Sequence, residues 1–242
     1  MRIGRLMAVT CVFASFVVTG ACVDAHPGAP PALEVERASV DDGHVADALA
    51  TAAVQQLELP GFGERRATFL KGLGFGSEEE MRRAAVDAPM AVYRVPLAAL
   101  AARDEQADPA AALVDAQLRI YPVLSDGDVV SSVTVSTARP VPRIVSLGRG
   151  PLVRELAKAR DLARAGAVGA GPAVGAPFVV ELVEQGWYVG HHDEHGALWL
   201  TALRADPRVP GSVALQSQPA TAVLASLGPA ARRALDRSAG GG

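Results

Sequence analysis

The stretch between Leu118 and Ser136, LRIYPVLSDGDVVSSVTVS, limits the possible folds more than any other part of the chain. Two runs rich in β-branched and aromatic residues flank residues 125–128, which contain Asp-Gly, a preferred dipeptide of tight hairpin turns. Polar and apolar residues alternate in the second run, so we expect Ser132, Thr134 and Ser136 on the solvent face of a half-buried strand. The chain therefore contains an antiparallel hairpin.

A second hairpin is predicted near the C-terminus, where Trp187–His192 and Ala197–Leu203 flank turn-forming residues. Further strands are expected at Met90–Val95, Arg143–Leu147 and Phe178–Val183. Helices are expected at Gly43–Leu57 with Asp42 as its cap, at Pro151–Ala165, and in a short segment close to the C-terminus. Together these elements predict an α+β fold, with an antiparallel sheet built from two hairpins and helices packed on one face.

A weak internal similarity suggests how this domain is organised. APMAVYRV, beginning at Ala88, resembles APFVVELV, beginning at Ala176, and each segment follows a predicted helix and precedes a hairpin. A duplication would divide the globular domain, residues 42–236, into two related helix-strand-hairpin units. These units would be residues 42–165 and 166–236, and they would share one sheet. A disordered tail would follow at residues 237–242.

Glycine-rich segments do not indicate a nucleotide site. GLGFGS has the alternating glycines of a phosphate loop before a predicted helix, but it lacks Gly-Lys-Ser/Thr. Ser77 and Glu80 form a capping box, and three carboxylates in the first helical turn would repel a phosphate. The 23 basic residues form no continuous block that could follow a nucleic-acid backbone. We therefore expect neither a nucleotide nor a nucleic acid as partner.

The N-terminus carries a targeting signal. Arg2 and Arg5 precede the apolar run Leu6–Val18, which is shorter than the roughly 20 residues of a membrane-spanning helix and suits a secretory signal peptide. Thr-Gly-Ala-Cys follows, ending at Cys22, and resembles the lipobox of bacterial lipoproteins, although Thr19 stands where Leu is usual.

This resemblance implies a signal peptide at residues 1–21, cleavage before Cys22, and a lipid such as palmitate on Cys22. Residues 22–41 would be the lipidated cysteine and a flexible tether, because the segment begins rich in Pro, Ala and Gly. Cleavage by ordinary signal peptidase, after Ala21 or Ala25, is the alternative. Val23 rather than Asp follows the cysteine, which in lipoproteins favours an outer membrane if one exists.

Cysteine usage agrees with lipidation. The chain has two cysteines, and Cys11 lies in the segment to be removed. Cys22 would then remain without a disulfide partner in an exported protein, unless it is modified. We expect a protein of the cell envelope or periplasm that is attached to a membrane through an N-terminal lipid.

The segment GHHDEHG at residues 190–196 is the strongest candidate for chemistry, since it holds three of the five histidines. Turn chemistry explains most of it as a polar hairpin tip. The alternative is a zinc site or an acid/base site formed by a set of neighbouring polar residues: His191, His192, Asp193, Glu194 and His195. His44 could supply a distant further ligand.

The expected strand pairing weighs against the metal interpretation. We expect His192 opposite Ala197 and His191 opposite Leu198. Successive strand residues point to opposite faces, so His191 and His192 could not both bind one ion without a bulge. We therefore expect no cofactor, with zinc as the alternative.

No catalytic arrangement is evident elsewhere. The chain lacks a G-x-S-x-G nucleophile elbow, a dinucleotide-binding fingerprint and a redox cysteine pair. We expect a membrane-tethered binding or interaction module rather than an enzyme, with an unknown envelope protein or small ligand as its partner. The alternatives are a metal-binding protein or metal-dependent enzyme that uses His191, His192 and His195, and a structural envelope protein.

Overall fold

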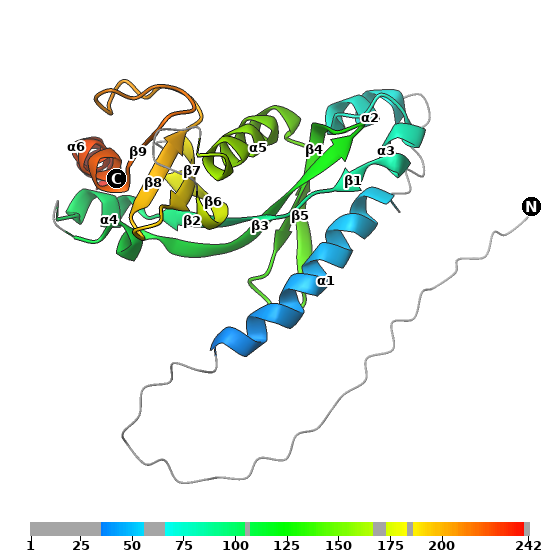
Figure 1. Ribbon diagram of the computed structural model, residues 1–242, viewed down its shortest axis with the longest axis horizontal. Coiled ribbons are helices and arrows are strands. Elements are labelled where there is room, and N and C mark those ends of the chain that lie inside the picture. Colours follow the sequence, from blue (N-terminus) through cyan, green and yellow to red (C-terminus); the bar gives the residue numbers. More distant parts are fainter. Residues whose placement is uncertain (1–34, 56–65, 105–106, 167–172, 183–185, 240–242) are drawn as a thin grey trace, which may run out of the picture.

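A computed structural model describes residues 35–55, 66–104, 107–166, 173–182 and 186–239 (Figure 1). The predicted signal peptide, Cys22, the first part of the tether and residues 240–242 lie outside the described residues. The elements are α1 (Val35–Gln55), α2 (Arg66–Leu73), α3 (Glu78–Arg83), β1 (Ala85–Val86), β2 (Met90–Val95), α4 (Leu97–Ala102), η2 (Pro109–Ala112), β3 (Val114–Ser125), β4 (Asp128–Ser136), β5 (Arg143–Leu147), α5 (Gly150–Arg164), β6 (Val174–Leu182), β7 (Gly186–His192), β8 (Leu198–Ala202), β9 (Ser217–Pro219) and α6 (Ala220–Ala239). None of the helices in these ranges is long and apolar enough to span a bilayer.

The described strands form one nine-stranded sheet in the order β5-β4-β3-β2-β6-β7-β8-β9, with β1 paired to β3. Neighbouring strands are antiparallel except β2 and β6, which are parallel, with Val92 opposite Val179. The α+β class is confirmed, and both predicted hairpins are present as β3–β4 and β7–β8. The sheet is nevertheless larger than two hairpins. It is mixed rather than purely antiparallel, because β2 and β6 pair in parallel at its centre.

Helices cover both faces of the sheet, so the expectation of helices on one face was wrong. Ile120 packs beneath α5, whereas the next residue, Tyr121, packs against α1 on the opposite face. In the same way, Val179 packs against α5 and Val180 packs against α6 on the opposite face. Figure 1 shows α5 and α1 on opposite sides of the sheet. The central strands are apolar on both faces, as expected for strands buried on both sides.

The predicted solvent face of β4 is also buried. Ser132, Thr134 and Ser136 are at most 8% exposed, because α5 covers part of this face. The Ser132 hydroxyl donates a hydrogen bond to the carbonyl oxygen of Gly148, which satisfies it within the interior. Alternation of polar and apolar residues identified the strand correctly but did not reveal a buried polar face.

Some element boundaries match the predictions and others do not. β2 and β5 have the predicted bounds, and Asp126 and Gly127 both have positive φ at the β3–β4 turn. Helix α1 begins at Val35, before the predicted start, so Asp42 lies inside the helix rather than at its cap. Helix α6 continues to Ala239, into the expected tail, and contains Pro229.

Gly74 and Gly150 allow their segments to pack closely against a backbone carbonyl group of β4. Val130 is the extra residue of a β-bulge in β4, since Val123 pairs with Ser131 and Leu124 pairs with Val129. A Cβ atom on Gly74 or on Gly150 would overlap the Val130 carbonyl oxygen. Close backbone packing against the bulge therefore explains the glycine at position 74, within GLGFGS, and the glycine at position 150, at the start of α5.

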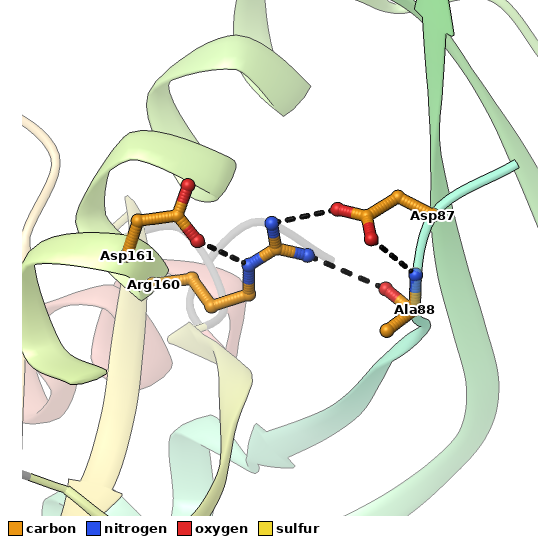
Figure 2. Close-up of polar contacts among 4 residues, drawn as sticks. All are labelled: Asp87, Ala88, Arg160 and Asp161. Atoms are coloured by element: carbon orange, nitrogen blue, oxygen red, sulfur yellow. Dashed lines mark hydrogen bonds and ion pairs between the residues drawn. The ribbon is translucent and has the colours of Figure 1, made fainter. Parts of the chain in front are cut away.

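Helix α5 is fixed to the sheet by a buried arginine (Figure 2). Arg160, which is 5% exposed, donates from Nη2 to Asp87 Oδ2 at 2.7 Å and from Nε to Asp161 Oδ1 at 2.9 Å. Its Nη1 donates to the Ala88 carbonyl oxygen at 3.4 Å. Burial opposes ionisation of Asp87, but the hydrogen bonds from Arg160 and the Ala88 backbone N–H, together with the charge of Arg160, outweigh burial and hold the pKa of this carboxyl below its usual value. These contacts connect α5 to the segment that leads into β2.

The two similar segments lie side by side at the centre of the sheet. The last six residues of APMAVYRV form β2, and residues 176–182 of APFVVELV lie in β6. The antiparallel strands that follow each segment extend outward in opposite directions. A duplication remains a prediction.

Candidate functional site

The histidine-rich hairpin differs from its predicted register by one residue. His192 pairs with Leu198 and His191 with Trp199, rather than with Ala197 and Leu198. The connecting loop is one residue longer because Asp193 organises it: its Oδ1 accepts hydrogen bonds from the backbone N–H groups of His195 and Ala197. A one-residue difference in register changes which side chains share a face of the sheet.

Both oxygens of the Asp193 carboxylate accept hydrogen bonds within this hairpin. Besides the two backbone contacts, its Oδ2 accepts a hydrogen bond from Trp199 Nε1 at 2.9 Å. The Trp199 hydrogen bond, followed by those of the loop backbone, holds the pKa of Asp193 below its usual value. The carboxylate therefore stabilises the turn, which is the structural role that turn chemistry predicts.

The three histidines of this segment point to different surroundings. His192 packs beside the ring of Phe178, with ring centroids 5.8 Å apart. His195 is exposed and lies 3.6 Å from the equally exposed Glu194. His191 is buried on the opposite face of the sheet from His192. Among the described residues, no three His, Cys, Asp or Glu side chains are arranged to hold a metal ion.

His191 has an unusual environment. It is 1% exposed, and neither ring nitrogen has a hydrogen-bond partner in the part of the chain that the structure describes. Burial lowers the pKa of His191 because it penalises the charged ring; the nearby Asp193 carboxylate opposes this effect and His192 adds to it. Burial therefore favours the neutral imidazole at this position.

This burial predicts a dependence of stability on pH. The unfolded chain binds a proton at His191 near pH 6.5, whereas the folded chain resists it, so the free energy of unfolding should fall as the pH is lowered below about 6.5. The slope from one such group cannot exceed about 1.4 kcal/mol per pH unit. His191→Leu should remove this dependence in urea unfolding measured between pH 7.5 and 5. An unchanged slope in the variant would show that another group is responsible.

The described surface has a cleft of about 690 Å³ beside the first turns of α5. Three separate segments line it: the first turns of α5 (Pro151, Leu152 and Glu155), the start of β7 (Gly186–Tyr188) and residues 203–208 after β8. Leu203 is buried, whereas Leu152 and Trp187 are only partly buried beside it. The cleft thus has apolar and aromatic walls and lies within the usual size range of small-molecule sites, about 300–1,000 Å³.

One ion pair fixes the wall of this cleft. Arg208 donates to the Asp206 carboxylate through Nε at 2.8 Å and through Nη2 at 2.6 Å. The Arg208 hydrogen bond, which outweighs burial, holds the pKa of Asp206 below its usual value. The Tyr188 hydroxyl also donates to Asp206, and burial together with this carboxylate raises the pKa of Tyr188. These groups satisfy one another, so we assign them to the support of the wall.

A second pair of charges is loosely arranged. Arg204 Nε lies 3.8 Å from Glu155 Oε2, beyond the 2.7–2.9 Å typical of a charge-assisted hydrogen bond. The Arg204 side chain is 86% exposed and that of Glu155 is 41% exposed. Exposed pairs of this kind contribute little to stability. Their charges therefore remain available to another molecule.

The sequence offered little indication of this cleft. Glu155 lies on α5, and its ionic partner is Arg204, in the segment after β8. Trp187 was interpreted only as a strand residue. The one useful signal is LRADPRVPG at residues 203–211, a long polar loop rich in Pro and charge after an apolar strand.

Comparisons with protein-family models, with curated proteins and with solved structures give no match for this chain.

Proposed function

We propose that this protein is a lipid-anchored binding module of the bacterial cell envelope that holds a small molecule in the cleft beside α5. The observation that carries the proposal is the cleft itself: a concave space of about 690 Å³ with partly exposed apolar walls. Binding sites commonly combine such walls with a small number of polar groups that orient the ligand. Glu155 and Arg204 are suitable polar groups.

The fold supports this role by holding the walls in fixed positions. α5 is connected to the segment before β2 through Arg160 and Asp87, and the 203–208 segment is braced by Asp206. A site on a rigid framework loses little conformational freedom when a ligand binds. We infer binding rather than catalysis, since the described residues that line the cleft include no Ser, Thr, Cys, His or Lys that could act as a nucleophile.

Indole is a suitable first probe, because it is flat, apolar and small enough for the cleft. Amide chemical shifts of isotope-labelled protein should change around Gly186, Trp187 and residues 203–208 when indole is added. Trp187→Ala should weaken indole binding by about tenfold or more, since a large aromatic contact is lost. Trp199→Ala, at the other tryptophan, is the matched control and should bind as the wild type does. Shift changes that avoid the cleft would contradict the proposal.

The anchor predicts a separate result in a bacterial host. Metabolic labelling with a clickable palmitate analogue should mark the full chain, and detergent phase separation should place it with membrane proteins. Cys22→Ser should abolish both properties, while Cys11→Ser should leave both unchanged. Export of an unlabelled product from the wild-type chain would instead favour ordinary signal-peptide cleavage.

A further inference from the structure

The cleft contains two kinds of charged pair, and only one of them is available to a ligand. Asp206 and Arg208 meet through two short hydrogen bonds, and the Asp206 carboxylate also accepts from the Arg208 backbone N–H. Glu155 and Arg204 are 3.8 Å apart, and no hydrogen bond joins them within the described residues. A ligand can therefore interact with one carboxylate and one guanidinium group without breaking the pair that supports the wall.

These two opposite charges stand beside an apolar surface. Glu155 lies one helical turn from Leu152 on α5, and Arg204 directly follows the buried Leu203. Trp187 lines the same cleft from β7. A ligand with a single charge would satisfy one member of the Glu155–Arg204 pair and leave the other without its counterion. A ligand with both charges would satisfy both members.

We propose that the ligand of the cleft is a zwitterion with a large apolar side chain, for which an aromatic amino acid is the simplest form. Its ammonium group binds the Glu155 carboxylate, its carboxylate binds the Arg204 guanidinium, and its side chain packs against Trp187 and Leu152. A planar guanidinium suits a carboxylate because it can donate two parallel hydrogen bonds. This inference rests on the proposed binding function and specifies its ligand class.

Three ligands with the same side chain test this assignment by isothermal titration calorimetry with the purified protein. They are phenylalanine, N-acetylphenylalanine, which lacks the ammonium charge, and phenylalanine amide, which lacks the carboxylate. Each blocked form should bind about tenfold or more weakly than phenylalanine, because each loses a hydrogen bond between charged groups. Equal binding of all three forms would overturn the proposal.

Two variants assign each charge to its partner. Glu155→Gln should bind phenylalanine and N-acetylphenylalanine equally, because the partner of the ammonium group is gone. Arg204→Gln should bind phenylalanine and phenylalanine amide equally. Glu79→Gln and Arg233→Gln, exposed positions on α3 and α6, should keep the full preference of the wild type. A preference that persists in both cleft variants would overturn the assignment of these two residues.

The outcomes separate the ligand class from the binding function. Indole binding in the cleft without a preference for phenylalanine over its blocked forms would overturn the zwitterion and leave the binding function standing. Failure of both indole and phenylalanine to bind in the cleft would overturn both.

Discussion

Replacing Asp87 by alanine is expected to lower the free energy of unfolding by about 3 kcal/mol, because the change removes the less exposed of the two carboxylates that pair with the buried guanidinium of Arg160. Arg160 is 5% exposed and cannot reach bulk water without moving α5. For a domain of this size the midpoint of thermal unfolding should fall by about 6–12 °C. Urea unfolding followed by circular dichroism would measure the change.

Two further variants distinguish a buried charge from a general packing defect. Asp161→Ala removes the exposed partner of the same guanidinium and should lower stability by less than about 1 kcal/mol. Adding Arg160→Met to Asp87→Ala should recover most of the loss, because replacing both members of a buried pair by apolar groups is often close to neutral. Similar losses in Asp87→Ala and Asp161→Ala would contradict this explanation.

The Asp87 carboxylate also predicts that the free energy of unfolding depends on pH in the acid range. The pKa of Asp87 is lowered in the folded state, so its contribution is complete at neutral pH and is lost as the pH falls below about 4. The difference in stability between the wild type and Asp87→Ala should therefore shrink toward pH 2.

Replacing Gly150 by alanine is expected to lower the free energy of unfolding by about 1–3 kcal/mol, the usual effect of overpacking. The added Cβ atom would overlap the Val130 carbonyl oxygen and push the start of α5 away from β4. An alanine in a helix would otherwise stabilise the protein by about 0.5–1 kcal/mol relative to glycine. A loss of stability in Gly150→Ala, rather than a gain, would therefore show that Gly150 packs closely against the Val130 carbonyl group.

Gly72 provides the matched control, since it is also helical and a Cβ there would meet no atom within 4 Å. Gly72→Ala should leave stability unchanged or raise it slightly. Gly74→Ala should be at least as harmful as Gly150→Ala, because Gly74 approaches the same oxygen and has a φ of 99°. A stabilising Gly150→Ala would show that α5 can shift without loss.

Local sequence signals predicted the elements of this fold better than their arrangement. The Asp126-Gly127 turn and the apolar run of β2 depend on neighbouring residues, so their positions could be predicted from the chain alone. The parallel pairing of β2 with β6 could not be predicted in this way, because it joins residues such as Arg94 and Glu181 that lie 87 positions apart. The burial of Ser132 likewise depends on α5, which packs onto β4 from a later part of the sequence.

The candidate site was harder to predict for the same reason. Glu155, Trp187 and Arg204 belong to residue types common on any surface, and they form a cleft only because three separate segments meet. His191 was identified from sequence as a possible ligand, but it is buried in the interior, and the one-residue change in register places it opposite Trp199 rather than Leu198. Predicting the turn chemistry of Asp193 was possible, whereas the length of its loop required the structure.

The central pairing of β2 with β6 also has a consequence for how the chain reaches its native state. Strands β3 to β5 and strands β6 to β8 join neighbours that are close in sequence, so each group can assemble through short loops. Joining the two groups instead requires closure of a long loop, whose entropic penalty must be met before any contact of the pairing stabilises it. We therefore expect the outer parts of the sheet to form early and its centre to form last, in the rate-limiting step of folding.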